Sequence, residues 1–305
     1  MTSVGRFRRE TICASGPLAR PVSALDFVAP RTPDEAVAAL RVSAPGEAAV
    51  LAGGTDLLFD LEEGRLQPRR LVSLRHLPWR TLDWNGPSLT VGSTLPLRAL
   101  ENDPDVRHRI PGLYAAVRAV GSVALRQRAT LGGNLGRAAP ASDLLPVLLA
   151  LEGEVELVGP EGRRTVPIDR FLRASRSTAL QPSELVRSVR LAGARPRSAY
   201  LWQRVRPAND ISQIGVAVAF SESAGRWTVA LGGVPPRPVL APEAAAELPS
   251  GQPDVEEASR AGERLAESPA LVSDRRATEE HRRRLAALLC ARAVRAALEG
   301  PARRR

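Results

Sequence analysis

The pattern of hydrophobic and polar positions divides the chain into two parts. In residues 23–192, short apolar runs typical of strands alternate with segments whose apolar residues repeat at helical spacing. In residues 196–300, three apolar runs separated by turn residues predict antiparallel strands, and two longer segments with helical spacing follow them. We therefore expect an α+β protein with a larger domain at 23–192 and a smaller α+β domain at 196–300, preceded by a flexible basic extension at 1–22 and followed by a basic tail at 301–305.

The beginning of the larger domain carries clear start and stop signals. Thr32, Pro33 and Glu35 predict a helix that opens with a capping box and a proline in its first turn. The string AAVLAGG predicts a short buried strand that ends on a glycine pair. TDLLFDLEEG then predicts a helix with its leucines on one face, ended by Gly64.

Further along, turn and capping residues predict two hairpins and two helices. TLDWNGPSLTVGS predicts a hairpin with Asn85 and Gly86 as its turn, and EVELVGPEGRRTVP predicts a second hairpin. We expect a helix that begins with Ser93 or Thr94 as its cap. The string GLYAAVRAVGSVALRQ predicts one continuous helix.

Two glycine pairs, about eighty residues apart, are the strongest chemical signal in the sequence. The first pair, Gly53 and Gly54, is followed by Thr55 and Asp56; the second pair, Gly132 and Gly133, is followed by Asn134. Glycine permits positive φ and close approach of a ligand, so a glycine turn that enters a helix can aim free N–H groups at an anion. Two such turns in one domain favour a ligand with an extended phosphate bridge, such as a dinucleotide.

Simpler structural roles stay open for the same residues. Gly53 and Gly54 can form a plain turn in which Thr55 only caps a helix. Asp143 can cap the helix LLPVLLAL or bind a ribose, and Ser142 can take over the capping role and leave Asp143 free. Neither glycine pair lies in the G-x-G-x-x-G pattern, and the lysine of a G-x-x-x-x-G-K-[ST] loop is absent, so another scaffold is expected.

Composition narrows the possible classes of protein. The net charge is +10, but all 43 basic residues are arginine and the aromatic content is 4%, so we do not expect nucleic-acid binding. No apolar run reaches the roughly 20 residues that a membrane span needs, and no signal peptide is recognisable, so we place the protein in the cytoplasm. Cys13, Cys290 and the three histidines show no metal-ligand spacing, and no set of residues indicates a catalytic acid, base or nucleophile.

Taken together, the strings AGGTDLL, TLGGNLGRAAPASDLLPVLLAL and SAYLWQRVRPANDISQIGVAVAF resemble the FAD-binding medium subunits of the molybdenum hydroxylases, over about residues 23–300. That family includes the medium subunits of carbon monoxide dehydrogenases and the flavin domain of xanthine dehydrogenases. The resemblance implies a two-subdomain FAD-binding domain of the vanillyl-alcohol oxidase type, followed by an α+β flavoprotein domain with an antiparallel sheet and helices. It also implies FAD that is not covalently bound, since no histidine or cysteine lies beside either glycine pair.

The resemblance further implies a set of cofactor-binding residues. The first glycine segment would contribute Ala52, Gly53, Gly54, Thr55, Asp56 and Leu57, and the second would contribute Ala129, Thr130, Gly133 and Asn134. Ser142 and Asp143 would reach the ribose or adenine, and Leu185 and Val186 would pack on a ring face. Several relatives carry a lysine near the polar edge of the flavin where this chain has none; Arg204 or Arg206 can replace it, or Trp202 can lie over the ring.

The function implied is that of an electron-transfer flavoprotein subunit. A large molybdopterin-binding subunit would oxidise the substrate and a small subunit with [2Fe–2S] clusters would pass electrons to FAD, in a dimer of heterotrimers. The substrate stays open among carbon monoxide, aldehydes, purines and heteroaromatic compounds, and the acceptor among NAD, a quinone and oxygen. Two other functions are compatible with the scaffold: a stand-alone FAD-dependent reductase, and an assembly or binding protein without redox activity.

Overall fold

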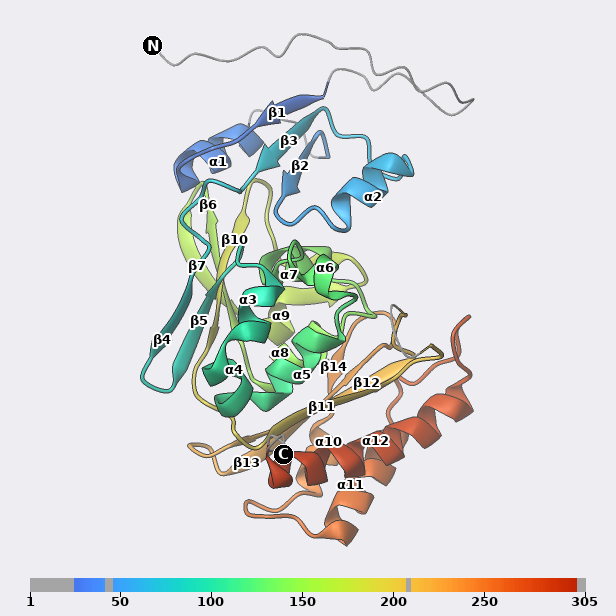
Figure 1. The fold of residues 1–305 in the computed structure, drawn as a ribbon. Helices are drawn as coiled ribbons and strands as arrows, with labels where there is room; N and C mark the ends of the chain where they lie inside the picture. Colours follow the sequence, from blue (N-terminus) through green and yellow to red (C-terminus); the bar gives the residue numbers. More distant parts are fainter. Residues whose placement is uncertain (1–24, 42–45, 207–209, 301–305) are drawn as a thin grey trace.

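The computed structural model describes residues 25–41, 46–206 and 210–300. Three parts, each built on its own sheet, follow one another along the long axis of the molecule (Figure 1). The extension and the tail expected at the two ends, and Cys13 with them, lie outside the described residues. Among the residues that the structure describes, no helix is long and apolar enough to cross a membrane.

The N-terminal part is a small parallel sheet with one helix after each of its first two strands. The strand order is β1-β3-β2. Its elements are β1 (Asp26–Val28), α1 (Pro33–Arg41), β2 (Ala48–Leu51), α2 (Leu57–Glu62) and β3 (Arg70–Ser73). The predicted capping box is confirmed, because the Glu35 N–H donates to Thr32 Oγ1 at 3.2 Å and the Thr32 N–H donates to the Glu35 carboxylate at 3.4 Å.

The middle part is a five-stranded antiparallel sheet with several short helices, in the order β4-β5-β10-β6-β7. Its strands are β4 (Leu82–Asn85), β5 (Ser88–Gly92), β6 (Glu154–Gly159), β7 (Gly162–Pro167), β8 (Leu172–Ala174), β9 (Ser177–Thr178) and β10 (Leu185–Leu191), of which β8 and β9 form a separate hairpin. Its helices are α3 (Leu97–Asn102), α4 (Pro104–Arg109), α5 (Pro111–Ala119), α6 (Val123–Arg126), α7 (Leu131–Arg137), α8 (Leu144–Ala150) and α9 (Ile168–Phe171).

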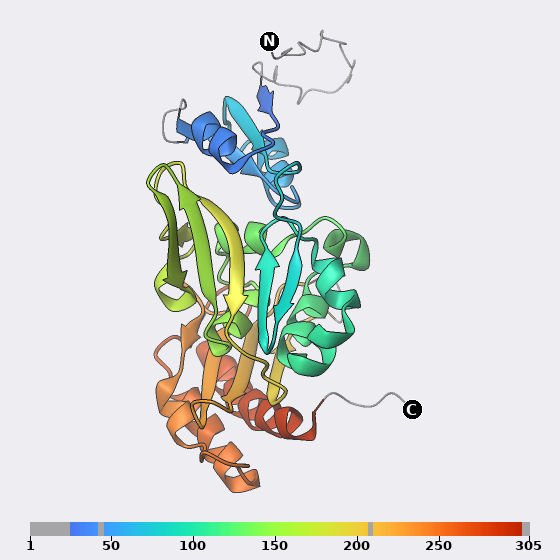
Figure 2. The ribbon, with the colours of Figure 1, turned by 90° about the vertical axis from the view of Figure 1, so that its left-hand side faces the viewer.

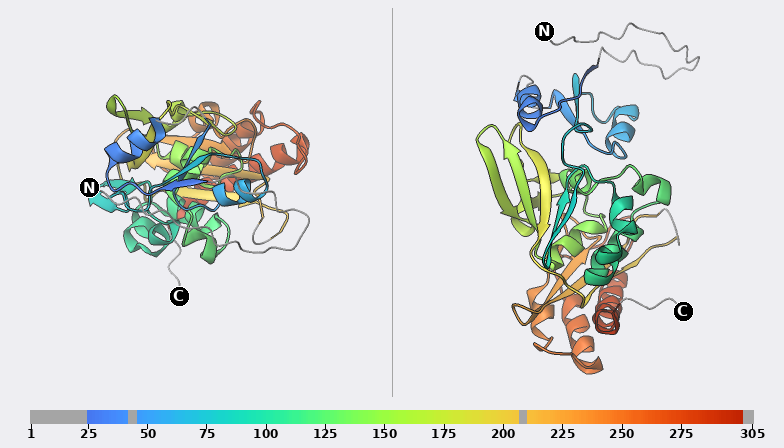
Figure 3. Two further views of the ribbon diagram at one scale, coloured as in Figure 1. Left: turned by 90° about the horizontal axis from the view of Figure 1, so that it is seen from above. Right: turned by 60° about the vertical axis from the view of Figure 1, so that its left-hand side comes forward.

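The C-terminal part is a four-stranded antiparallel sheet covered on both faces. Its elements are β11 (Ser198–Gln203), β12 (Ile214–Ser221), β13 (Arg226–Gly232), β14 (Val239–Leu240), α10 (Pro242–Ala246), α11 (Val255–Ala266) and α12 (Glu279–Glu299). Helices α11 and α12 lie below β11 and β12 in Figure 1, and α5 and α8 of the middle part contact the other face of the sheet. Figure 2 and the right-hand view of Figure 3 show the same order of the three parts along the molecule.

Strand β12 shows why the middle and C-terminal parts behave as one packed body. All of its residues are buried. Val216 and Val218 belong to the core beneath α11 and α12, whereas Ala217 and Ala219 belong to the core of the middle part. Successive residues of a strand point to opposite faces, so a sheet covered on both sides needs a continuous apolar strand. The expected α+β class and the antiparallel C-terminal sheet with helices are confirmed.

Two predictions about helices were wrong. The continuous helix expected over GLYAAVRAVGSVALRQ is divided into α5 and α6. Gly121 adopts a φ of +46°, and Ser122 caps a new helix by accepting from the Leu125 N–H at 3.1 Å. The helix expected to start at Ser93 or Thr94 begins later, after Pro96. The segment that precedes this helix lies against α7 instead, and the Ser93 carbonyl accepts a hydrogen bond from the Gly132 N–H.

Two local details also differ from expectation. Asn85 pairs with Ser88, so the first hairpin turns on Gly86 and Pro87 and not on Asn85 and Gly86. Gly86 has a φ of +58°, whereas Asn85 does not adopt the positive φ that an Asn-Gly turn requires of both its residues. In α2, Leu58 is exposed and Asp60 is the buried residue. The apolar pattern of α2 therefore does not mark its buried face.

Candidate functional site

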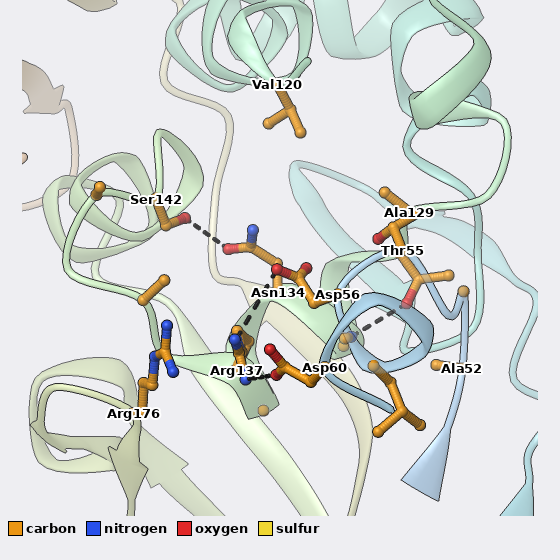
Figure 4. A pocket seen from close by; sticks show the side chains of 18 of the residues that line it. Ala52, Thr55, Asp56, Asp60, Val120, Ala129, Asn134, Arg137, Ser142 and Arg176 are labelled. Carbon is orange, nitrogen blue, oxygen red and sulfur yellow. Dashed lines mark hydrogen bonds and ion pairs between the residues drawn. The ribbon is translucent and has the colours of Figure 1, made fainter. Parts of the chain in front are cut away.

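A cavity of about 870 Å³ lies where the three parts meet. Its walls come from the segment between β2 and α2, from α7 and the segment that follows it, from the start of β10, and from three loops of the C-terminal part. Figure 4 shows Asp56 and Asp60, at the start of α2 and within it, next to Arg137 of α7, with Asn134 and Ser142 nearby. A volume of this size is in the range of sites for large organic ligands.

The first glycine pair forms one wall by close approach of two backbones. A Cβ atom on Gly53 would lie 2.0 Å from the Arg128 carbonyl oxygen, and Gly54 has a φ of +79°. The N–H groups of Gly54, Thr55 and Asp56 donate to no other residue in the described chain. The predicted glycine turn with free N–H groups is therefore present at this position.

The second glycine pair is not a loop. Gly132 and Gly133 lie in the first turn of α7, which Thr130 caps by accepting from the Gly133 N–H at 3.0 Å. The Gly132 N–H donates to the Ser93 carbonyl, so the N–H groups of this pair are already engaged. At Gly133 and Gly136 the helix presents a surface without side chains to the cavity. A Cβ atom on Gly136 would meet nothing within 4 Å, so the space beside it is open.

An ion-pair cluster connects the two glycine segments. Asp60 on α2 is buried, and Arg137 on α7 binds its carboxylate at 2.5 Å and lies 3.8 Å from that of Asp56. Burial acts to raise the pKa of Asp60, but hydrogen bonds from Arg137 and Arg65 outweigh it and hold the pKa below its ordinary value. The carboxylate therefore fastens α2 to α7 across the floor of the cavity.

Ser142 and Asn134 settle one of the alternatives that the sequence left open. The Ser142 hydroxyl donates to Asn134 Oδ1 at 2.6 Å and accepts from the N–H groups of Leu144 and Leu145. Ser142 is therefore the residue that caps α8, and Asp143 makes no side-chain cap bond. The Asn134 amide NH₂ donates to no residue in the described part of the chain, so it is available to a ligand.

The carboxylate of Asp143 is bound by the C-terminal part. Its Oδ1 accepts from the Tyr200 hydroxyl at 2.8 Å and the Ser212 hydroxyl at 2.6 Å, and its Oδ2 accepts from Arg204 at 2.7 Å. Burial raises the pKa of Asp143, against the lowering by Arg204 and the two hydroxyl donors. Burial, with Asp143 beside it, also places the pKa of Tyr200 well above its usual value, so the phenol stays protonated and donates.

Of the predicted cofactor-binding residues, all but Trp202 and Arg204 line the cavity. Trp202 shares a strand face with Tyr200 and stacks on it, with ring centroids 5.4 Å apart. The Arg204 guanidinium turns to Asp143 and the Ala119 carbonyl, because a buried carboxylate needs donors. The alternative cation, Arg206, pairs with Asp210, which does line the cavity.

Several lining residues were not found from the sequence. The additional charged lining residues are Asp60, Arg137, Arg176, Glu184, Asp210, Asp274 and Arg276. Asp60 and Arg137 had a weak local signal, since Asp60 lies in the helix after the first glycine pair and Arg137 lies in the helix that contains the second. Asp274 and Arg276 had none, because the loop that carries them reaches the cavity through tertiary contacts, including the ion pair of Asp274 with the buried Arg282 at 2.8 Å. No cluster that could hold a metal ion occurs within residues 25–41, 46–206 and 210–300.

Two protein families match this chain, and together they cover most of its length. Residues 23–192 match the family described as the FAD binding domain in molybdopterin dehydrogenase, and residues 199–297 match the CO dehydrogenase flavoprotein C-terminal domain.

Individual relatives agree with the family match. The chain is 29% identical over 200 residues to the carbon monoxide dehydrogenase medium chain of Hydrogenophaga pseudoflava, covering 65% of this chain and 69% of that protein. It is 28% identical over 275 residues to the nicotine 6-hydroxylase medium subunit of Paenarthrobacter nicotinovorans, covering 89% and 96%.

Solved structures share the whole fold. A carbon monoxide dehydrogenase from Hydrogenophaga pseudoflava matches with a TM-score of 0.83 at 27% identity, covering 92% of this chain and 99% of that chain. Quinoline 2-oxidoreductase from Pseudomonas putida 86 matches with a TM-score of 0.82 at 25% identity, covering 91% and 98%. With a family match over more than half of its length and a fold shared over nine-tenths of it, the chain belongs to the FAD-binding medium subunits of the molybdenum hydroxylases.

Proposed function

We propose that the cavity holds FAD without a covalent bond and that this chain is the electron-transfer flavoprotein subunit of a molybdenum hydroxylase complex. The observation that carries the proposal is the cavity itself, since the free N–H groups of the first glycine segment and the bare glycine surface of α7 line one space.

The residues present suit a dinucleotide. The free N–H groups of Gly54, Thr55 and Asp56 are donors for phosphate oxygens. The buried hydroxyl of Ser93, which also lines the cavity, has no hydrogen-bond partner in the described chain, and buried hydroxyls rarely stay unpaired. The bare surface at Gly136 leaves room for a ligand to lie against the helix backbone.

Each part of the cofactor then has a set of neighbours. We assign the diphosphate to the N–H groups of the segment formed by Ala52, Gly53, Gly54 and Thr55, with Asp56 and Leu57 adjacent. From the facing wall we assign Ala129, Thr130, Gly133 and Asn134. Ser142 and Asp143 lie on the ribose or adenine side, and Leu185 and Val186 supply apolar contact to a ring face.

The chain needs no catalytic acid, base or nucleophile for this function. When bound, FAD supplies the capacity to accept and release electrons. The chain's own residues hold it: N–H groups fix the phosphates, the Asp60–Arg137 pair keeps α2 and α7 at a set separation, and apolar side chains exclude water. The Asp143 cluster keeps the C-terminal part closed over the cavity.

The partners follow from the names of the relatives, which are medium chains and subunits of larger enzymes. We propose a large molybdopterin-binding subunit and a small [2Fe–2S] subunit, assembled with this chain as a dimer of heterotrimers. The substrate would bind the large subunit, and NAD, a quinone or oxygen would take electrons from FAD.

Purification of the chain with co-expressed large and small subunits tests the proposal. We expect one complex in size-exclusion chromatography, with flavin that acid precipitation releases into the supernatant and whose absorbance bleaches when the substrate is added without an acceptor. A folded chain without flavin would contradict cofactor binding. A chain that turns over NADPH with a small substrate in the absence of other subunits would instead support a stand-alone reductase.

A further inference from the structure

Each carboxylate that lines the cavity has an arginine within 4 Å, although Asp56 and Asp60 share Arg137. The pairs are Asp56 with Arg137 at 3.8 Å, Asp60 with Arg137 at 2.5 Å, Asp143 with Arg204 at 2.7 Å, Glu184 with Arg164 at 2.6 Å, Asp210 with Arg206 at 3.4 Å and Asp274 with Arg282 at 2.8 Å. The wall therefore presents little net negative charge to an anionic ligand.

Three arginines line the same cavity, and they differ in their partners. Arg137 is held by Asp56 and Asp60, and Arg276 lies 3.7 Å from Asp274. The guanidinium of Arg176 has no ion pair and no side-chain hydrogen bond within the described chain. Arg176 is thus the lining cation whose charge is left for a ligand.

The backbone of Arg176 is held in a conformation that arginine rarely adopts. The residue lies in the two-residue turn between β8 and β9 with a φ of +56°, where glycine or asparagine is more favourable. Its N–H donates at 3.0 Å to the carbonyl of Ala138, which ends α7 and itself has a φ of +45°. The turn is therefore anchored to the helix that carries the glycine surface, and an unfavourable residue at such a place points to a function of its side chain.

The position of the side chain agrees with such a function. Figure 4 shows Arg176 on the side of the cavity where Arg137 and Asp60 lie, and its charge contributes to lowering the pKa of Asp60. Arg176 is an exposed residue that lines the cavity, so an anion there can reach its side chain without displacing a protein partner.

We propose that Arg176 is the counter-ion of the diphosphate of the bound dinucleotide. The proposal rests on the proposed function, which places FAD in this cavity. The free N–H groups beside Gly54 supply hydrogen bonds but only partial charge, whereas a diphosphate carries two full negative charges. A planar guanidinium with two parallel N–H donors suits phosphate oxygens, and at Arg176 no carboxylate competes for it.

The test uses the full chain stripped of its flavin. Arg176→Gly removes the guanidinium and places a residue that tolerates the positive φ, so the fold is expected to be retained. We expect the dissociation constant for FAD to rise about ten- to a hundredfold, the scale of one charged hydrogen-bonded contact. Arg176→Asn, which also tolerates this φ, is expected to show the same loss and guards against an effect of the glycine alone.

The salt dependence of FAD binding, together with competition by ADP, shows whether Arg176 acts through its charge or through its shape. Raising the potassium chloride concentration is expected to weaken FAD binding more steeply in the parent than in either variant, and ADP as a competitor of FAD is expected to lose affinity by the same factor as FAD. Arg173→Ala is the matched control, because Arg173 is an exposed arginine of the same hairpin that does not line the cavity. It is expected to keep the parent's affinity and salt dependence.

Several results would overturn the proposal. FAD affinity within about twofold of the parent in both variants, or an affinity loss with unchanged salt dependence, would mean that Arg176 does not act through its charge. A loss of the same size in Arg173→Ala would reduce the effect to the general positive charge of the hairpin. A parent chain that binds no FAD would contradict the proposed function itself and this inference with it, so the two failures are distinguishable.

Discussion

Asp143 serves two parts of the molecule through one residue. Its main chain begins α8 beside the cavity, and its carboxylate is bound by Tyr200, Ser212 and Arg204. The sequence left a helix cap and a ribose contact as the alternatives. The observed partners lie 57 to 69 positions further along the chain, so no local pattern could have indicated them. The sequence could therefore single out Asp143 as an important residue, but it could not show which side chains bind its carboxylate.

Replacing this carboxylate tests whether it holds the C-terminal part in place. Asp143→Ala would leave the buried Arg204 guanidinium without its anion, so we expect the free energy of unfolding to fall by about 3–5 kcal/mol. Urea denaturation of the purified chain measures this.

Tyr200→Phe is the milder control for that experiment. It removes one donor and leaves the ion pair with Arg204 intact, so we expect a loss of about 1–3 kcal/mol. If Asp143→Ala lost FAD with no change in unfolding free energy, the carboxylate would serve the cofactor alone and the role in stability would be wrong.

At the scale of elements, local signals worked where one helix or strand determined its own ends. The capping box at Thr32 was predicted from its own residues and is present. The two closing helices were predicted from their spacing, and the structure shows that Asp254 and Thr278 cap them. Local signals failed where tertiary contacts decided. Gly121 divides a stretch with helical spacing, and the second glycine pair became the first turn of α7 because Thr130 caps it and the Ser93 carbonyl binds its N–H group.

A substitution on the surface of α7 should have opposite effects on the stability of the helix and on the binding of the ligand. Gly136 faces the cavity, and a Cβ atom there would meet no protein atom within 4 Å. Gly136→Ala should therefore stabilise the flavin-free chain by about 0.5–1 kcal/mol, because alanine favours a helix over glycine. The same methyl group would occupy space proposed for FAD, so we expect weaker FAD binding, measured by fluorescence titration.

Two further glycines serve as controls for that substitution. Gly251→Ala, in a loop outside the cavity lining and with open space around its Cβ, should leave FAD affinity unchanged. Gly132→Ala should destabilise the protein itself, since its Cβ would lie 2.4 Å from Ser93. Unchanged FAD affinity in Gly136→Ala would mean that the cofactor does not lie against this helix.

At the scale of the whole molecule, the cavity belongs to no single part. The glycine segments come from the FAD-binding region, whereas Asp210 and Asp274 come from loops of the C-terminal part. The resemblance to a family therefore identified the first set of lining residues well, because they lie in its characteristic strings. It could not identify the second set, which depends on how the C-terminal sheet packs against α5 and α8.

The network of ion pairs also predicts how the molecule responds to acid. Hydrogen bonds from Arg126, at 2.8 and 3.0 Å, hold the pKa of Glu101 below its ordinary value, and hydrogen bonds from Arg164 do the same for Glu184. Because these pKa values are lower in the folded than in the unfolded chain, their stabilisation is fully present above about pH 5 and is lost as the pH falls through the folded values. We expect the free energy of unfolding to decline steadily below about pH 4.5.

Glu101→Gln shows whether these groups cause that decline. The variant keeps the shape of the side chain but cannot titrate, so it should be less stable than the parent at pH 7 and should lose less stability between about pH 5 and pH 3. Glu280→Gln breaks an exposed pair with Arg284 and should change stability by less than about 1 kcal/mol at either pH. A decline of equal slope in the parent and in Glu101→Gln would assign acid sensitivity to other groups. A shallower decline in Glu101→Gln than in the parent would mean that the ion pair of Glu101 with the buried Arg126 stabilises the folded chain. Arginines would then stabilise the molecule through the carboxylates that they hold in its interior.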